Sequence, residues 1–188
     1  VGIARIYETF GEVKVPASCT VNGILCERHP QSVSATAKRG WERIAHNYIQ
    51  TEFMVNYRDV REKEKAVILR VLDLIEQTAG KRPKGWLSSS LRCTVNTSDI
   101  CKELGLTYHC DYMNDEQPYL IKTAHGPLVS TPYTQEANDI GMFLRRNPPA
   151  DEALGLWKDD VDERYRAGRK SGRMVTSGMH TPPHGRPA

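Results

Sequence analysis

Apolar positions recur along the chain with the spacing of helices in some stretches and of strands in others. The clearest helix is predicted over residues 59–79, where Ile68, Val71 and Leu72 lie on one apolar face. Gly80 then ends this helix. Further helices are predicted over residues 2–10, 30–39, 97–104 and 150–167. Strands are predicted over residues 15–22, 41–46, 84–89, 106–112, 119–124, 127–133 and 173–180.

The alternation of short strands with helices predicts βαβ units and a parallel sheet, in either an open doubly wound arrangement or a barrel. In both arrangements ligands collect at the carboxyl ends of the strands. Polar residues stand at these ends in the sequence, namely Asn22, His46, Ser88 to Ser90, Asp111 to Gln117, and His180. We therefore expect a polar site at this edge of the sheet.

The composition fits a single globular domain over residues 1–188, with 39% hydrophobic and 26% charged residues. A net charge of +3 gives no reason to expect nucleic acid or a membrane surface as a partner. No apolar run reaches the about 18 residues that a membrane-spanning helix needs. The sequence leaves homo-oligomerisation open.

Five cysteines are scattered along the chain without the C-x-x-C pairing of a metal site. This odd, scattered set favours reduced thiols and therefore a cytoplasmic location. The chain begins without methionine, inside a predicted helix, and ends soon after a predicted strand. We therefore expect a fragment of a longer polypeptide, truncated at both ends.

Several stretches carry a family resemblance. They are residues 82–140, in which YHCDYMNDEQPY at 108–119 and PYTQEANDI at 132–140 are the specific parts, and VPASCTVNGILCERHP at 15–30, GWERIAH at 40–46 and GRMVTSGMH at 172–180. Together they resemble the polysaccharide deacetylase superfamily, and within it the branch of metal-independent allantoinases and cyclic imide hydrolases. The resemblance implies a distorted, incomplete (β/α) barrel that hydrolyses non-peptide carbon–nitrogen bonds. The implied substrates are small amides, ureides, imides or N-acetylated sugars.

The metal-using members that this sequence resembles bind a divalent ion through an early Asp and two His spaced four residues apart. The first of these histidines matches His46, whereas Gln50 stands where the second is expected, and the Asp would precede Val1. A neutral carboxamide is a poorer zinc ligand than imidazole. The resemblance therefore favours a metal-independent site without a cofactor, and a divalent metal such as zinc is the alternative.

Two histidines are candidates for proton transfer, because each ends a predicted strand. His46 could accept a proton from water or hold the substrate, or it could simply be hydrogen bonded to the backbone. His180 matches the closing motif of the family, where a histidine near the leaving group suits general-acid catalysis, or it is a surface residue before a turn. The other histidines, His29, His109, His125 and His184, have no such support.

The acid-rich loop supplies further candidates. Side-chain alternation places Asp111 on the same face as His109, at the mouth of the expected site. Asn114, Asp115 and Gln117 could surround a small ligand that both donates and accepts hydrogen bonds, as a ureide or imide ring does. Asp115 could also act as a catalytic base or acid. The alternative is ordinary turn chemistry.

Trp86 and Asn22 complete the candidate binding residues. Trp86 could stack on a ring, although an aromatic residue in a strand is more often part of the core. Asn22 ends the predicted strand 15–22. Asn138 and Asp139 match an Asn-Asp pair of the family, or they cap the next helix.

Three hypotheses follow for the function. The first is a metal-independent hydrolase of carbon–nitrogen bonds, with a catalytic set of His46, His180 and Asp115 and a substrate-binding set of Asn22, Trp86, Asp111, Asn114 and Gln117. The second is a metal-dependent N-deacetylase of polysaccharides or chitooligosaccharides. The third is a non-catalytic binding protein with a decayed site, which the replacement at Gln50 motivates.

Overall fold

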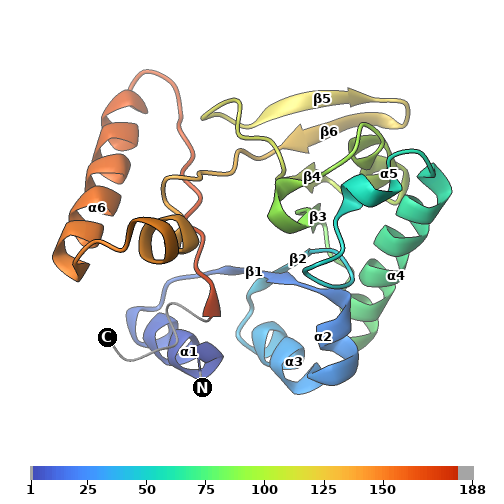
Figure 1. The fold of residues 1–188 in the computed structure, drawn as a ribbon, viewed down its shortest axis with the longest axis horizontal. Helices are drawn as coiled ribbons and strands as arrows, with labels where there is room; N and C mark the ends of the chain where they lie inside the picture. The colour runs from blue at the N-terminus through green and yellow to red at the C-terminus, as the bar shows by residue number, and fades with distance from the viewer. Residues whose placement is uncertain (1, 182–188) are drawn as a thin grey trace. The chain divides into compact units, whose positions relative to one another are not determined.

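The computed structural model describes residues 2–181, which fall into two compact units (Figure 1). The sheet unit consists of residues 16–112 and 119–131. The helical unit consists of residues 1–15, 113–118 and 132–188, of which 2–15, 113–118 and 132–181 are described. Both units are discontinuous in sequence, so the chain crosses from one to the other four times. The single domain predicted over residues 1–188 stays a prediction.

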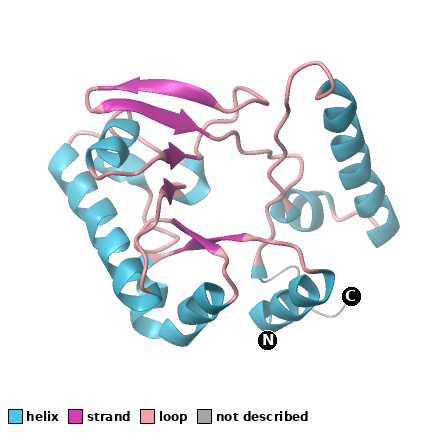
Figure 2. Ribbon diagram, turned by 180° about the vertical axis from the view of Figure 1, so that it is seen from behind, coloured by secondary structure: helices cyan, strands magenta, loops and turns pink. Residues whose placement is uncertain are grey.

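A six-stranded sheet organises the sheet unit, in the order β1-β2-β3-β4-β6-β5. Its strands are β1 (Ser18–Val21), β2 (Glu42–Ala45), β3 (Gly85–Trp86), β4 (Tyr108–His109), β5 (Tyr119–Thr123) and β6 (Gly126–Ser130). All neighbours are parallel except β5 and β6, which form the antiparallel hairpin drawn as two long arrows in Figure 2. The register pairs Val21 with Ala45, Ala45 with Trp86, and Trp86 with His109. The carboxyl ends of β1 to β4 therefore lie along one edge of the sheet.

Four helices pack in the sheet unit, namely α2 (Gly23–Arg28), α3 (Pro30–Lys38), α4 (Arg61–Ala79) and α5 (Thr97–Glu103). Helix α4 contacts α2, α3, α5 and β2. It buries the predicted apolar face, including Ile68, Val71 and Leu72, in the core, and Trp86 and Leu128 bring β3 and β6 into the same cluster. Short 3-10 turns, η1 (Met54–Tyr57) and η2 (Ser89–Leu91), lie in the loops after β2 and β3.

The helical unit contains α1 (Gly2–Val13), the π-helix η3 (Ile140–Arg146) and α6 (Ala150–Ala167). Its segment 172–180 runs beside 132–139. The Thr176 hydroxyl donates to the carbonyl of Pro132 at 2.9 Å, and the Asp139 N–H donates to the carbonyl of Gly178 at 3.0 Å. These bonds hold two stretches together that are about forty residues apart in the chain.

The predicted elements form with some differences. The expected strands 84–89 and 106–112 shorten to two residues each, in β3 and β4. The expected strand 173–180 is wrong, because within the described residues this segment forms only an isolated parallel bridge from Asn138 to Gly178. Its Thr176 N–H donates to the hydroxyl of Thr134 instead of a strand carbonyl. Helices α2 and η3 lie where the sequence predicted none.

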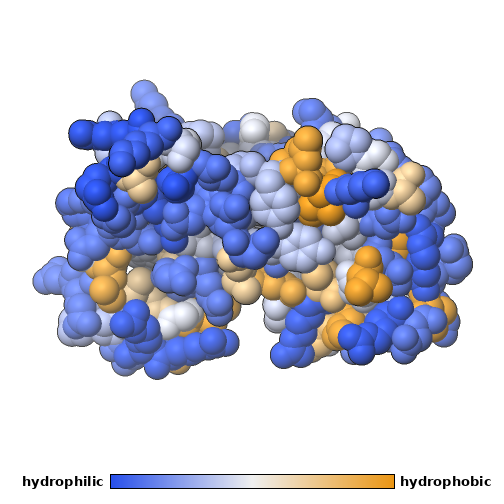
Figure 3. All heavy atoms as spheres, turned by 90° about the horizontal axis from the view of Figure 1, so that it is seen from above, coloured by the Kyte–Doolittle hydropathy of each residue, from blue (hydrophilic) through white to orange (hydrophobic). Residues whose placement is uncertain are grey.

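The face drawn in Figure 3 is mostly hydrophilic, with apolar side chains in small separate groups. The large apolar side chains that are exposed include Val95 and Leu120. None of the helices within residues 2–181 is both long and apolar enough to cross a bilayer. His184 lies beyond the residues that the structure describes. The cytoplasmic location stays a prediction.

Candidate functional site

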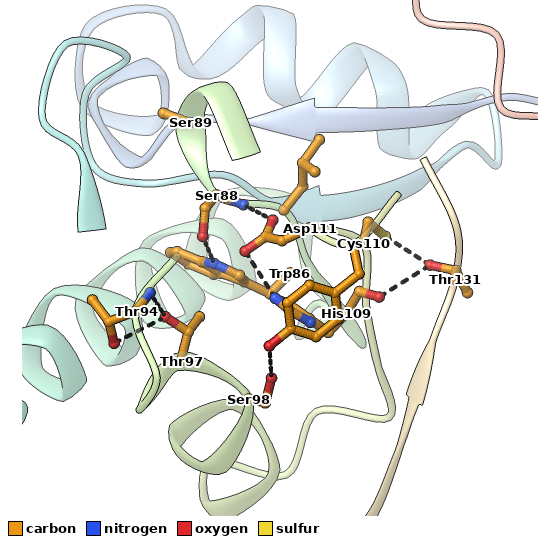
Figure 4. A network of polar contacts seen from close by, with 12 residues as sticks. Trp86, Ser88, Ser89, Thr94, Thr97, Ser98, His109, Cys110, Asp111 and Thr131 are labelled. Carbon is orange, nitrogen blue, oxygen red and sulfur yellow. Dashed lines mark hydrogen bonds and ion pairs between the residues drawn. The ribbon is translucent and has the colours of Figure 1, made fainter. Parts of the chain in front are cut away.

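Hydrogen bonds connect the residues that follow β1, β2, β3 and β4 in the sheet unit. The Asn22 amide donates to the backbone carbonyl of His46, and the Nδ1–H of His46 donates to the carbonyl of Leu87, 2.6 Å away. The next N–H along the chain, that of Ser88, donates to Oδ1 of Asp111 at 2.5 Å (Figure 4). The polar strand ends that the sequence expected at one edge of the sheet are therefore brought together for these four strands.

His46 is buried at the end of β2, and its hydrogen bond identifies its tautomer. A carbonyl oxygen can only accept, so in the neutral ring Nδ1 carries the proton and Nε2 carries the lone pair. A lone pair at Nε2 suits an imidazole that accepts a proton. The backbone hydrogen bond that we considered as the alternative is present, and a role of His46 in proton transfer stays a prediction.

The segment after His46 is attached to the turn that follows β3. Asn47 is buried in a left-handed conformation, with φ of 40°, and its Oδ1 accepts a hydrogen bond from the Ser89 N–H at 3.0 Å. The Ser89 hydroxyl donates to Oε1 of Gln50 at 3.4 Å. In the Gln50 side chain only the amide oxygen is suited to bind a cation, and this oxygen already accepts the hydrogen bond from Ser89. These residues therefore do not fit a zinc motif built on two histidines.

Asp111 and His109 form a buried pair in which neither side chain is exposed. Nε2 of His109 lies 2.8 Å from Oδ2 of Asp111. Tyr112 packs its ring edge-on against His109, with the centroids 5.0 Å apart. Cys110 points the other way, and its thiol lies 2.9 Å from the Thr131 hydroxyl (Figure 4). The predicted alternation, with Asp111 on the face of His109 and opposite Cys110, is what the structure contains.

Trp86 lies in the core with no exposed surface, which favours the core role over stacking on a ligand. Its indole Nε1–H donates to the hydroxyl of Ser88 at 2.9 Å. Trp86 thus holds Ser88, which lies just after the end of β3, in place. Trp86 therefore has no exposed surface with which to contact a substrate.

Cys93 joins His109 and Asp111 in a group whose candidate ligand atoms all lie within 4.8 Å of one another. Burial, with the nearby Asp111 charge, raises the pKa of Cys93 to about 12, so it is a neutral thiol near pH 7. An ion held by Nε2 would leave an N–H on Nδ1 of His109, and that atom has no partner among the described residues. Histidines that bind metals almost always donate this second N–H to an acceptor. The arrangement favours a hydrogen-bonded pair over a metal site.

In the helical unit, His180 pairs with Asp139. Nδ1 of His180 lies 2.6 Å from Oδ1 of Asp139, and the backbone N–H of His180 donates to Oδ2 of the same carboxylate. The Asp139 side chain is fully buried, whereas that of His180 is 40% exposed. A buried carboxylate that holds Nδ1–H fixes the tautomer, so Nε2 is the nitrogen that takes up or releases a proton.

Asp139 is positioned by the bridge between Asn138 and Gly178 and by the start of the π-helix η3. Such helices are rare and often occur at functional sites. The Asn138 amide donates to the hydroxyl of Tyr133 at 2.7 Å, and its Oδ1 accepts from the N–H of Ile140. A Cβ at Gly178 would lie 2.6 Å from the Tyr133 hydroxyl, so a side chain there would displace this network. The capping alternative therefore holds for Asn138, and Asp139 binds His180 instead.

The loop 113–118 is tied to the segment 172–174 within the helical unit. The N–H of Met174 donates to the carbonyl of Glu116, and the Gln117 amide donates to the carbonyl of Gly172 at 2.8 Å. The Asp115 carboxylate accepts the N–H groups of Glu116 and Gln117, which is the turn chemistry that the sequence left open. Asn114 and Asp115 are exposed. Their roles in binding or catalysis stay predictions.

Two residues of these networks were not selected from the sequence. His109 had no support from the predicted strand ends, although β4 ends at this residue and its place on the face of Asp111 was a usable signal. Asp139 was left between a family match and a cap, and only the fold shows that His180 is its partner. In both cases the informative observation is a contact with another titratable side chain.

Known proteins resemble this chain along its whole length. It is 28% identical over 206 aligned positions to a provisionally assigned polysaccharide deacetylase of Schizosaccharomyces pombe, covering 99% of this chain and 62% of that protein. A crystal structure of a provisionally assigned polysaccharide deacetylase from Mycobacterium smegmatis superposes with a TM-score of 0.86 at 25% identity, covering all of this chain and 66% of that one. A crystal structure of an allantoinase superposes with a TM-score of 0.87 at 27% identity, covering 100% and 62% of the two chains.

These similarities confirm two of the predictions. The chain resembles the polysaccharide deacetylase superfamily, including an allantoinase. The fold is of that α/β type, and its six-stranded sheet is open between β1 and β5 in the described residues, as expected of an incomplete barrel. No family model matches the sequence. The chain spans about 62% of the length of the curated relative.

Proposed function

We propose that this chain is part of a hydrolase of non-peptide carbon–nitrogen bonds, acting on a small amide, ureide, imide or N-acetyl group without a metal. The observation that carries the proposal is the pair of His180 and the buried Asp139, 2.6 Å apart. The similarity to deacetylases and to an allantoinase supports the same reaction class.

Hydrolysis of such a bond needs a proton for the departing nitrogen. The Nδ1–H of His180 donates to Asp139, so the proton that His180 can give to the departing nitrogen is the one on Nε2. The carboxylate stabilises the imidazolium until that proton is transferred. The side chain is 40% exposed, so the ring is within reach of small molecules. His180 is therefore assigned as the general acid.

Hydrolysis also needs a water molecule made nucleophilic. His46 suits this role, because Leu87 holds its Nδ1–H and the lone pair is at Nε2. The exposed Asn114 and Asp115 are assigned to orienting the substrate or water. Metal independence is supported by Gln50, whose oxygen accepts a hydrogen bond from Ser89 where a second histidine would be needed.

The test is turnover by the protein on a ureide, a cyclic imide and an N-acetylated oligosaccharide, with and without a chelator. We expect hydrolysis of at least one substrate, resistant to chelation, and its loss in His46→Ala and His180→Ala. His29→Ala is the matched control, because this histidine is exposed at a helix start. Activity that disappears on chelation would favour the metal-dependent N-deacetylase. Substrate binding without any turnover would favour the non-catalytic binding protein.

A further inference from the structure

One peptide group connects His46 to Asp111. The carbonyl of Leu87 accepts the Nδ1–H of His46, at 2.6 Å. The N–H of Ser88 belongs to the same peptide group, and it donates to Oδ1 of Asp111 at 2.5 Å (Figure 4). A carboxylate, a peptide and an imidazole thus form a continuous line of hydrogen bonds along the ends of β4, β3 and β2.

The carboxylate at the far end of this line is held at both oxygens. Oδ1 takes the Ser88 N–H, and Oδ2 lies 2.8 Å from Nε2 of His109. Nδ1 of His109 is buried and has no hydrogen-bond partner in residues 2–181. An unpaired lone pair costs less than an unpaired N–H, so the proton is on Nε2 and points at Asp111.

Asp111 does not reach the surface. Its side chain is fully buried, and that of His109 is as well. A residue so enclosed is poorly suited to the substrate contact expected from the sequence. Among the described residues, the Leu87–Ser88 peptide links it to a candidate catalytic group, His46.

We propose that Asp111 and His109 are positioning residues for His46, acting through the Leu87–Ser88 peptide. A negative carboxylate that accepts the Ser88 N–H polarises the peptide, and this makes the Leu87 carbonyl a stronger acceptor for the Nδ1–H of His46. The result is a histidine held in one orientation and one tautomer, as a directly bonded carboxylate would hold it. This inference rests on the proposed function, because it assigns His46 to proton transfer.

Trp86 and Tyr112 keep the line in place. The Trp86 indole donates to the Ser88 hydroxyl, which fixes the residue whose N–H faces Asp111. Tyr112 covers the His109 ring edge-on, and its hydroxyl lies 3.3 Å from that of Ser98. Water is kept from the carboxylate, so its interaction with the peptide is stronger than it would be in solvent.

The kinetic test uses Asp111→Asn, which keeps an acceptor for the Ser88 N–H but removes the charge. A positioning role predicts that kcat falls about 10- to 100-fold while KM stays within about twofold. A substrate-binding role predicts the reverse, with KM raised and kcat kept. Asp73→Asn is the matched control, since it makes the same exchange at a partly exposed carboxylate of α4 that pairs with Arg82, and it should leave both constants unchanged.

A second pair of variants separates the bond from the fold. His109→Gln keeps an amide N–H near the position of Nε2, whereas His109→Asn places its amide near Nδ1, out of reach of Asp111. We expect the Gln variant to keep most of kcat and the Asn variant to lose about 10-fold or more. Equal kcat in both variants would overturn the proposal.

A spectroscopic measurement on the full chain does not depend on turnover. With ¹⁵N-labelled histidine, His46 should show a protonated Nδ1 whose proton exchanges slowly in the wild type and at least about tenfold faster in Asp111→Asn. An unchanged exchange rate in the folded variant would overturn the proposal. If the wild type hydrolyses none of the test substrates but this difference is found, the proposed function fails and the positioning of His46 stands.

Discussion

Glu64 is a carboxylate of α4 with no exposed surface. It accepts hydrogen bonds from the hydroxyls of Thr94, at 2.7 Å, and Thr97, at 2.5 Å. Both threonines are buried, and their hydroxyls accept backbone N–H groups of the same turn, those of Asn96 and Thr94. Glu64 therefore closes the turn that leads into α5, and its replacement tests how much a buried acceptor stabilises this loop.

Glu64→Leu keeps the side chain's bulk but removes both acceptors. Two hydroxyl donors are then buried without partners, at about 1–3 kcal/mol each. Burial of the new apolar side chain offsets about 1.5–3 kcal/mol of that loss. We expect the free energy of unfolding to fall by about 1–3 kcal/mol. Glu62→Leu is the matched control on the same helix, because Glu62 is exposed, and it should change the stability by less than about 0.5 kcal/mol.

Glu64→Gln keeps an acceptor oxygen and removes the charge. Burial raises the pKa of Glu64 above its ordinary value of 4.5, so the folded state holds this proton more tightly than the unfolded state. The stability contributed by the protonated form is complete below pH 4.5 and is lost as the pH rises through the folded pKa. Relative to the wild type, the Gln variant should therefore gain stability as the pH rises from 4 to 7.

The assay is urea unfolding followed by circular dichroism at several pH values between 4 and 8. The slope of the unfolding free energy against urea concentration must be the same in the wild type and the variants for the comparison to be valid. A Leu variant as stable as the wild type would refute the assigned role of the two hydroxyls. A Gln variant whose difference from the wild type does not change with pH would refute the buried-charge argument.

Three further outcomes are expected. Lys65 and Arg61 lower the pKa of Glu103 to about 2. The stability that Glu103 contributes is therefore complete above pH 4.5 and is lost as the pH falls toward 2. Acid unfolding of Glu103→Gln should accordingly depend less on pH than that of the wild type. Asp139→Asn should lower kcat by about 10- to 100-fold, because the Nδ1–H of His180 loses a charged acceptor, and an unchanged kcat would contradict the general-acid assignment. Gly178→Ala should lower the melting temperature and the activity together, whereas Gly155→Ala, where a Cβ meets nothing within 4 Å, should lower neither.

The sequence predicts most of the sheet unit because its signals there are local. Ile68, Val71 and Leu72 repeat with helical spacing and are buried, and Gly80 adopts the left-handed φ of 73° expected of a helix end. The strand-end rule brings His46 and Asp111 to one edge because β2, β3 and β4 are parallel neighbours.

The remaining features depend on contacts that no local pattern encodes. The line of hydrogen bonds from Asp111 to His46 passes through the Leu87–Ser88 peptide group. It therefore depends on the register of β3 and not on the side chain of Leu87 or Ser88. The bond from Asp139 to His180 requires two segments that are 41 residues apart to lie together. The segment 173–180 alternates like a strand, but only an isolated bridge at Gly178 forms.

The division of the chain into two discontinuous units has a consequence for its biosynthesis. A ribosome makes residues 16–131 before most of the helical unit, so all six strands can pair while the rest is still being translated. Residues 2–15 are made before the strands but belong with residues 132–181, which are made after them. Helix α1 and the loop 113–118 therefore stay without the rest of their unit until residues 132–181 have been made. During that interval the apolar residues of α1, such as Ile6 and Phe10, stay without the rest of their unit, and transiently exposed apolar surface is prone to aggregation.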